Sequence, residues 1–259
     1  MVKRIIILLL FPLCAFAQSG FFATDATFMV LAKNGTTAAT PYPGFTNGVA
    51  ILYLFNGTPN DSAQSYNLTL NNSPSYGTGL NGGSGKALTL LSASLQYANN
   101  ASLTNFTSFT IAAWYKPTDF LDYRCIVNFG DSATRNFEMD TRITTGKINV
   151  GFTQGALTYK ELQSTAAISS GAFHFLVGTY DGTTLKIYID GSLDSSTASF
   201  SGNPDAPTGH FTVGSILASG SFVPASFMNG TVQGLFIANR AITSTEVTTA
   251  YNSGLAVLQ

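Results

Sequence analysis

The sequence predicts an all-β fold, a sandwich or a barrel of many short strands, with one short helix near the C-terminus. Short apolar runs recur along the chain and are separated by Gly, Asn, Asp and Ser, a pattern typical of β-sandwiches and β-barrels. Thr, Gly and Asn are abundant whereas Glu and Lys are scarce, which excludes a helical bundle. The 20 Phe and 11 Tyr are enough aromatic side chains to fill a core, which excludes a disordered chain.

The apolar runs place the expected strands. We expect them at residues 49–55, 66–70, 87–91, 95–98, 109–116, 124–129, 136–141, 147–152, 172–180, 185–190, 210–214 and 232–239. Asp181-Gly182 and Asp190-Gly191 supply the positive φ values that tight hairpins need. The chain from Phe173 to about Thr197 is therefore expected to form a three-stranded meander.

A capping box predicts the helix. Thr243 and Glu246 are spaced so that each side chain satisfies the other residue's free backbone N–H group. Val247 and Tyr251 then face inward, and Gly254 is a suitable C-terminal stop. The helix is expected over residues 244–253.

The N-terminus has the pattern of a secretory signal. Lys3 and Arg4 precede a short apolar run, and Ala15 and Ala17 supply the small residues that a signal peptidase reads. We expect cleavage after Ala17 and a secreted or cell-surface product. The chain then divides into a signal peptide (residues 1–17), an N-terminal strand and linker (residues 18–47) and a β-sandwich domain (residues 48–259). A later apolar run of bilayer-spanning length is absent from the sequence, so we expect no transmembrane segment in the mature chain.

Charge and cysteine content exclude several classes of protein. Only 10% of residues are charged, with 12 Lys and Arg against 13 Asp and Glu, so a nucleic-acid binder is excluded. Two cysteines exclude a disulfide framework and a cysteine zinc site. Strand alternation places Cys125 on one face with Val127 and Phe129, as a buried thiol; an intermolecular disulfide is the alternative.

The segment that begins at Phe21 and ends at Ala32 is apolar and has two interpretations. It forms an edge strand of the same domain, or it is a strand offered to a neighbouring subunit, which would allow self-assembly.

A series of segments stands out by its order and spacing: residues 50–57, 60–62, 82–88, 95–98, 109–117 with the single Trp114, 173–191, 227–230 and 239–242. Together they resemble the laminin-G-like, concanavalin A-like jelly-roll domains that are common in secreted proteins. The resemblance covers roughly Gly48 to Gly254 and implies a two-sheet antiparallel jelly roll. Lectins, adhesion modules and glycosidases all use this architecture, so the fold alone does not decide between them.

Glycosidases of the family carry their carboxylates along one strand, and the local candidates are Glu138 and Asp140. Period-2 geometry places both side chains on one face. The enzymes of this family place the acid/base carboxylate further along the strand, and here that partner is missing, because Thr141 and Arg142 follow; Arg142 would also keep Asp140 ionised. We therefore expect an exposed surface pair, and keep glycoside hydrolase activity as an alternative.

Other catalytic arrangements find less support. The two histidines are His174 and His210, and we expect His174 to bridge strands in a structural role. The chain has no Gly-x-Ser-x-Gly nucleophile elbow, and two histidines do not make a usual catalytic zinc site.

The resemblance also implies a candidate Ca²⁺ site. Asn60 and Asp61 stand where family members often present a ligand, whereas the acidic residue that often accompanies it is missing near Gly230. Asp61 has an alternative role as the cap of the turn before Ser62.

The loop at residues 118–124 is the main candidate for ligand binding. Its candidate residues are Asp119, Phe120, Asp122, Tyr123 and Arg124. Aromatic rings and carboxylates are the groups that recognise sugars. The alternative is a solvated connection whose Phe120 and Leu121 fold back into the core.

Tyr159, Lys160 and Glu161 form a second candidate site for a ligand. The sequence as a whole predicts a secreted, non-catalytic recognition module that binds a glycan or an extracellular protein. A structural subunit of an extracellular or particle-surface assembly is the alternative.

Overall fold

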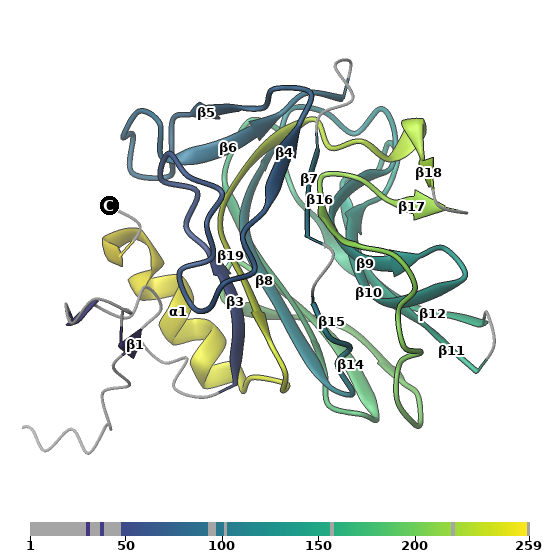
Figure 1. Cartoon of the computed structure of the whole chain (residues 1–259). Coiled ribbons are helices and arrows are strands. Elements are labelled where there is room, and N and C mark those ends of the chain that lie inside the picture. The colour runs from purple at the N-terminus through teal and green to yellow at the C-terminus, as the bar shows by residue number, and fades with distance from the viewer. Residues whose placement is uncertain are drawn as a thin grey trace, which may run out of the picture.

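A computed structural model describes residues 30–31, 37–38, 48–92, 97–100, 103–155, 158–218 and 221–257. Two antiparallel sheets lie face to face, and one helix packs against the outside of one of them (Figure 1). The predicted all-β sandwich with a C-terminal helix is thus confirmed. The predicted signal peptide and its cleavage site lie outside the described residues.

The sheet that carries the helix is called the back sheet here. Its strand order is β15-β14-β13-β8-β19-β6-β5, and β3 pairs with β19. The strands are β3 (Val49–Tyr53), β5 (Ser75–Gly77), β6 (Ala87–Leu90), β8 (Phe109–Pro117), β13 (His174–Tyr180), β14 (Thr184–Ile189), β15 (Ser192–Ser199) and β19 (Gly230–Ala238). Strands β13, β14 and β15 are neighbours in antiparallel register, which confirms the predicted meander.

The opposite sheet is called the front sheet. Its strand order is β12-β11-β10-β9-β16-β7-β4, and β17 joins β9 in parallel. The strands are β4 (Thr69–Asn71), β7 (Tyr97–Asn100), β9 (Arg124–Asp131), β10 (Thr134–Thr141), β11 (Lys147–Gln154), β12 (Thr158–Ala167), β16 (Phe211–Val213), β17 (Leu217–Ala218) and β18 (Ser221–Phe222). A 3-10 helix, η2 (Pro224–Ser226), follows β18.

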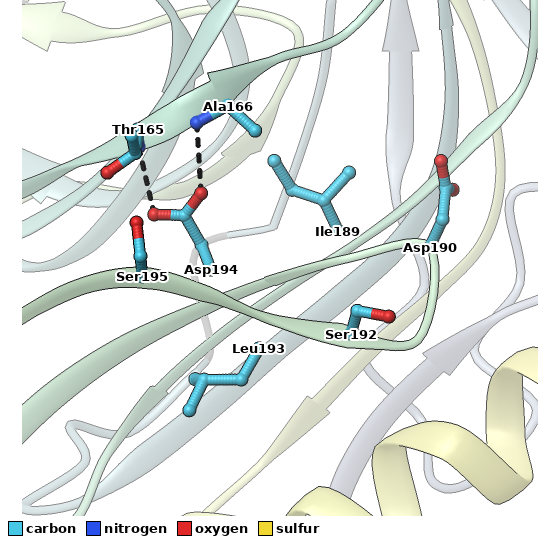
Figure 2. A pocket seen from close by; sticks show the side chains of 8 residues that line it. All are labelled: Thr165, Ala166, Ile189, Asp190, Ser192, Leu193, Asp194 and Ser195. Carbon is cyan, nitrogen blue, oxygen red and sulfur yellow. Dashed lines mark hydrogen bonds between the residues drawn. The ribbon is translucent and has the colours of Figure 1, made fainter.

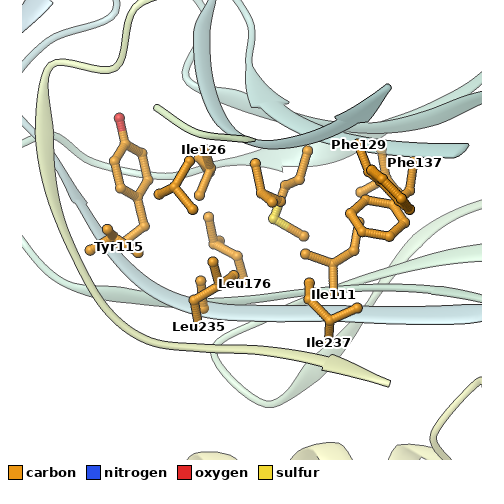
Figure 3. Packing of buried hydrophobic residues seen from close by; sticks show 14 of the residues in the cluster. Ile111, Tyr115, Ile126, Phe129, Phe137, Leu176, Leu235 and Ile237 are labelled. Carbon is orange, nitrogen blue, oxygen red and sulfur yellow. The ribbon is translucent and has the colours of Figure 1, made fainter. Parts of the chain in front are cut away.

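The main core fills the space between the two sheets. Ile111, Tyr115, Leu176 and Ile237 of the back sheet face Phe137 and its neighbours in the front sheet (Figure 3). Aromatic rings contribute much of this layer, and Phe137 lies 5.6 Å from Phe109 between ring centroids. Buried apolar area of this kind is the dominant favourable term in folding.

A second apolar layer lies between the back sheet and helix α1 (Ser244–Val257). Val247 and Ala250 are fully buried, and Tyr251 stacks on Trp114 with 5.6 Å between ring centroids. The capping box forms as predicted, because Glu246 N–H donates to the Thr243 hydroxyl at 3.2 Å and Thr243 N–H donates to the Glu246 carboxylate at 2.7 Å.

The predicted C-terminal stop is wrong, because α1 continues through Gly254 to Val257. A Cβ atom on Gly254 would lie 2.9 Å from Nε1 of Trp114. The glycine therefore allows the helix to approach the tryptophan and does not end the helix.

Five observed strands were not predicted: β2 (Thr37–Ala38), β5, β12, β17 and β18. β12 has ten residues and forms the edge of the front sheet, but it is mostly polar and more than half of its residues are exposed. A search of the sequence for apolar runs therefore misses this strand.

The predicted N-terminal strand is described only at β1 (Val30–Leu31), which pairs with β2 (Thr37–Ala38) in a sheet of their own. The rest of the segment from Phe21 to Ala32 lies outside the described residues, so its proposed role in self-assembly stays a prediction.

Candidate functional site

The outer face of the front sheet carries a cluster of charged, amide and aromatic side chains. Strand pairing sets Glu138 of β10 opposite Asn128 of β9 and Gly151 of β11, and sets Asp140 opposite Asn149. The alternate residues of β10, Phe137 and Met139, lie in the main core. Because side chains alternate across a strand, Glu138 and Asp140 point to the side away from that core, as the sequence predicted.

The two carboxyl groups are buried, so the prediction of an exposed pair is wrong. Glu138 is 3% exposed and Asp140 is 2% exposed. Burial raises the pKa of Glu138 well above its ordinary value, although the Arg135 guanidinium opposes the shift. Burial also raises the pKa of Asp140, against the opposing effects of Glu138, Arg142 and Asn149, so Arg142 does not keep this pKa at its ordinary value.

Arg142 connects the buried carboxyls to the loop at residues 118–124. Its guanidinium lies 5.4 Å from the centroid of the Tyr123 ring and forms an ion pair with Glu161 of β12. Its Nε atom lies 3.7 Å from Oδ1 of Asp140. Tyr123 is 43% exposed and the Glu161 side chain is 46% exposed. The two segments predicted to bind a ligand, residues 118–124 and residues 159–161, therefore meet at the guanidinium of Arg142.

Arg135 and Tyr159 close the other side of the cluster. The Arg135 guanidinium is paired with Glu138 and lies 5.1 Å from the centroid of the Tyr159 ring. A Cβ atom on Gly151 would lie 2.6 Å from Cζ of that ring, so the glycine makes room for the tyrosine. Asn149 Nδ2 donates to the Tyr159 hydroxyl at 3.1 Å and to Asp140 at 3.0 Å.

We call these eight side chains the outer-face cluster: Tyr123, Arg135, Glu138, Asp140, Arg142, Asn149, Tyr159 and Glu161. Within the described part of the chain, two buried amide oxygens beside the carboxyls accept no hydrogen bond: Oδ1 of Asn149 and Oδ1 of Asn128. A buried acceptor without a donor is costly, so both oxygens favour a donor such as a hydroxyl group.

The loop residues predicted to bind a ligand divide into two groups. Asp119 accepts hydrogen bonds from Arg124 Nη2 at 2.7 Å and Asn229 Nδ2 at 2.7 Å, and Arg124 is buried and also donates to the Phe227 carbonyl at 3.2 Å. Burial on its own would raise the pKa of the Asp119 carboxyl, but the hydrogen bonds from Arg124 and Asn229 outweigh burial and lower this pKa. Asp119 and Arg124 therefore hold the loop in place.

Phe120 packs against the main core, as the alternative interpretation of the loop predicted. Leu121 does not, since it is 72% exposed. Asp122 has a half-exposed side chain that lies 3.8 Å from Arg124, and Tyr123 faces the outer-face cluster. Asp122 and Tyr123 are thus the two predicted loop residues that a ligand can reach.

Cys125 is buried as predicted, but on the other face. A register irregularity between Met139 and Asp140 pairs Cys125 with Asp140, whereas Val127 still pairs with Met139 in the core. Burial, together with Glu138 and Asp140, raises the pKa of the thiol well above its ordinary value. The bulge explains why simple alternation misplaced this residue.

The residues predicted to bind Ca²⁺ do not form a set that fits the ion. Both oxygens of Asp61 accept backbone N–H groups, from Leu52 and Ala63 at 2.9 Å on one oxygen and from Gln64 at 3.1 Å and Tyr66 at 3.2 Å on the other. Asn60 is exposed beside it. Among the residues that the structure describes, no three His, Cys, Asp or Glu side chains gather as a metal site. Asp61 is a buried cap, the role that the alternative interpretation gave it.

The two histidines lie outside the outer-face cluster. His210 directly precedes β16, and its Nδ1 lies 3.0 Å from Nδ2 of Asn99 in β7. His174 lies at the start of β13 and contacts Asp190 and Ser169.

Comparison with known proteins identifies the family. The model of the concanavalin A-like lectin/glucanases superfamily matches residues 92–248. The chain belongs to this superfamily. The matched residues include strands β9, β10, β11 and β12, and therefore the whole outer-face cluster. No curated protein matches the chain.

Solved structures share the fold of this superfamily member at low sequence identity. Domain 4 of AbnA, an extracellular GH43 arabinanase from Geobacillus stearothermophilus, in complex with arabinotriose, has 19% identity and a TM-score of 0.62, over 78% of this chain and 98% of that one. The binding domain of Paraclostridial Mosquitocidal Protein 1 has 15% identity and a TM-score of 0.59, over 80% of this chain and 52% of that one.

The binding domain of Botulinum Neurotoxin DC, in complex with SialylT, has 14% identity and a TM-score of 0.59, over 82% of this chain and 52% of that one. This chain thus matches about half the length of these toxin domains. In the described part of the chain, no helix has the length and apolar character needed to cross a membrane.

Proposed function

We propose that the protein is a carbohydrate-recognition module that binds a neutral glycan at the outer-face cluster. The observation that carries the proposal is the meeting of Tyr123, Arg142 and Glu161 at the exposed rim of a face whose deeper members are amides and carboxyls. A tyrosine ring offers an apolar surface to the C–H face of a sugar, and its hydroxyl offers a hydrogen bond. Carboxylates, guanidinium groups and amides are suitable partners for sugar hydroxyls.

The pairing of charges within the cluster favours a neutral sugar. Arg135 is paired with Glu138, and Arg142 is paired with Glu161 and lies near Asp140. Each of these two guanidinium groups already has a carboxyl partner, so an anionic sugar could pair with a guanidinium only by displacing that carboxyl group. A neutral glycan needs no such exchange.

Membership of the superfamily and the fold-level similarity to domain 4 of the arabinanase, whose structure holds arabinotriose, support the carbohydrate assignment. The burial of Glu138 and Asp140 supports recognition in preference to glycoside hydrolysis at this face. A retaining mechanism needs two carboxyls that reach the sugar, about 5–5.5 Å apart. Here both are covered, with side-chain exposures of 4% and 3%.

Calorimetric titration with arabinotriose, after a screen on a glycan array, tests the proposal. We expect Tyr123→Ala to weaken binding about ten-fold or more, a loss of about 1.4 kcal/mol. Leu91→Ala is the matched control, because Leu91 is similarly exposed at 44% but follows β6 of the back sheet. Binding to no glycan on the array, or equal affinities of the two variants, would overturn the proposal.

The expected preference for neutral sugars gives a second test. Binding of a neutral glycan should change less than about two-fold with salt, because salt screens interactions between exposed charges. A strong loss of affinity at high salt, or a preference for sialylated glycans on the array, would contradict the assignment of a neutral ligand.

A further inference from the structure

A second polar network lies at the edge of the sandwich, at the loop that joins β12 to β13. Nδ1 of His174 lies 2.8 Å from Oδ2 of Asp190, and Nε2 of His174 lies 2.9 Å from the hydroxyl of Ser169. The three residues are connected in the order hydroxyl, imidazole, carboxylate. This is the order in which hydrolytic enzymes connect a nucleophile, its base and the group that orients the base.

The backbone fixes the tautomer of the histidine. Ser169 N–H donates to Nε2 of His174 at 3.2 Å. Because an N–H group cannot accept a hydrogen bond, Nε2 carries the lone pair and the ring proton of the neutral imidazole is on Nδ1, facing Asp190. In this tautomer the imidazole can take the proton of the Ser169 hydroxyl.

The base and its orienting carboxylate are held by the back sheet. His174 pairs with Tyr115 of β8, and Oδ1 of Asp190 accepts the N–H of Phe175 at 2.8 Å. The Asp190 N–H donates to the Phe175 carbonyl at 2.8 Å, so the backbone clamps this residue from both sides. Asp190 has a φ of 50°, the positive value that the tight hairpin turn at Asp190-Gly191 requires, so the turn also fixes its position.

The nucleophile in this arrangement is open to solvent. Ser169 is exposed, and a Cβ atom on Gly171, two residues later, would meet nothing within 4 Å. A substrate can therefore approach the hydroxyl without displacing the core.

An open groove of about 390 Å³ lies beside the network, between the end of β12 and the β14–β15 hairpin (Figure 2). Asp190 lines one end of the groove, and Ala166, three residues before Ser169, lines the opposite wall. Ile189 and the half-exposed Leu193 provide an apolar surface between them. Asp194 has both oxygens occupied by Thr165 and Ala166 N–H groups, at 2.8 and 3.0 Å, so it is part of the wall.

We propose that Ser169, His174 and Asp190 form a hydrolytic triad that acts on carboxylic esters with a short aliphatic acyl or alkyl group. The Ser169 Oγ atom attacks the ester carbonyl carbon while its proton moves to Nε2 of His174. The bond to the alcohol oxygen breaks as that proton moves to the leaving oxygen, which releases the alcohol. Water then attacks the acyl-Ser169 ester by the same proton transfers and releases the carboxylic acid.

Asp190 acts as the positioning residue, because it contacts the imidazole and not the ester. The proposal is independent of carbohydrate binding at the outer-face cluster. A sequence search for Gly-x-Ser-x-Gly misses such a triad, because Ser169 lies in a loop and has a different context.

Covalent labelling of the full chain with a fluorophosphonate probe tests the proposal. The intact mass should increase by one adduct, and peptide mapping should place the adduct on Ser169. Ser169→Ala should abolish labelling, whereas Ser170→Ala, the matched control at the exposed neighbouring serine, should label like the wild type.

Hydrolysis of p-nitrophenyl acetate and butyrate gives the second readout. We expect the wild type to be about 100-fold faster than Ser169→Ala, at the low end of the contribution of general-base catalysis. Asp190→Asn should slow labelling while circular dichroism shows an intact sheet. If the wild type is not labelled, or if Ser169→Ala changes neither labelling nor hydrolysis, the network is a structural loop cap and the proposal is wrong.

Discussion

The guanidinium of Arg142 lies 5.4 Å from the centroid of the Tyr123 ring, and this contact joins a loop to the outer face of a sheet. Tyr123 precedes β9, whereas Arg142 follows β10. The same guanidinium is paired with Glu161 of the edge strand β12. One side chain thus organises the rim where we propose that a glycan binds.

Arg142→Gln should therefore weaken glycan binding more than it weakens the fold. We expect about a ten-fold loss of affinity, because Tyr123 and Glu161 lose their common partner, which is a loss of about 1.4 kcal/mol. Arg142→Lys keeps the charge but lacks the planar stacking surface, and should give an intermediate loss. Calorimetric titration and thermal melts check both variants; equal affinities of Arg142→Gln and the wild type would remove Arg142 from the site.

The buried Glu138 should make stability depend on pH. Its pKa is raised in the folded state, so the folded chain retains a proton that the unfolded chain loses once the pH exceeds the ordinary value for glutamate. The contribution of this group to the free energy of unfolding should therefore fall as the pH rises above about 4.3.

Urea unfolding of the wild type and Glu138→Gln across the pH range isolates this effect. The stability of the wild type relative to the variant should decrease steadily with rising pH. Glu161→Gln is the control, because that carboxylate is 46% exposed. Parallel stability curves for the wild type and Glu138→Gln would show that the pKa of Glu138 is the same in the folded and the unfolded chain, and would contradict the prediction.

The sequence predicted the interior of the sandwich better than its outer face. Runs such as the one that forms β8 are mostly apolar, and the expected strand at residues 109–116 agrees closely with Phe109–Pro117. β12 was missed, although Leu162 and Ser164 are buried and Tyr159 and Glu161 lie on the other face. Without this strand, the sequence could not place Tyr159 and Glu161 beside Glu138.

The burial of Glu138 and Asp140 was beyond the sequence for a different reason. It depends on Arg135, Asn149 and Tyr159, which the chain brings together across three strands. The bulge beside Asp140 also shifts Cys125 to this face. Neither the long-range contacts nor the bulge leaves a local pattern in the sequence, whereas the same-face placement of Glu138 and Asp140 follows from alternation alone.

Asp61 should be a structural residue whose role does not require Ca²⁺. Asp61→Asn replaces one acceptor oxygen by an NH₂ group, which cannot accept hydrogen bonds from the backbone N–H groups that face it. We therefore expect this substitution to lower the free energy of unfolding by at least about 2 kcal/mol. Addition of CaCl₂ or of EDTA should shift the melting temperature of the wild type by less than about 1 °C, since a ligand that binds the folded state raises it by mass action. A clear calcium-dependent rise would restore the metal site.

Asp194 should stabilise the contact between the two sheet edges. Its carboxylate on β15 accepts N–H groups from Thr165 and Ala166 of β12 as well as from Ser196. Burial on its own would raise the pKa of the Asp194 carboxyl, but these hydrogen bonds outweigh burial and lower this pKa to about 2. A folded-state pKa below the ordinary value means that the stabilisation is present above about pH 3.9 and is lost as the pH falls towards the folded value.

Asp194→Asn should accordingly destabilise the protein by about 2 kcal/mol at neutral pH, and the difference from the wild type should shrink in acid. Asp122→Asn is the control, because its side chain is 49% exposed. Denaturant unfolding at neutral and acidic pH measures both; a difference between Asp194→Asn and the wild type that is independent of pH would contradict the assignment.

Gly254 should resist the substitution that usually stabilises a helix. Replacing glycine by alanine inside an exposed helix gains about 1 kcal/mol, because glycine loses more conformational freedom on folding. Here the new Cβ atom would lie 2.9 Å from Nε1 of Trp114, closer than ordinary contact, so the helix or the indole must move. We expect Gly254→Ala to leave the melting temperature unchanged or lower and to alter the fluorescence emission of Trp114, the chain's single tryptophan.

Ser253→Ala, one position earlier on α1, is the matched control and should keep the fluorescence emission of the wild type. A gain of about 1 kcal/mol with unchanged emission would show that α1 does not pack on the tryptophan at this distance.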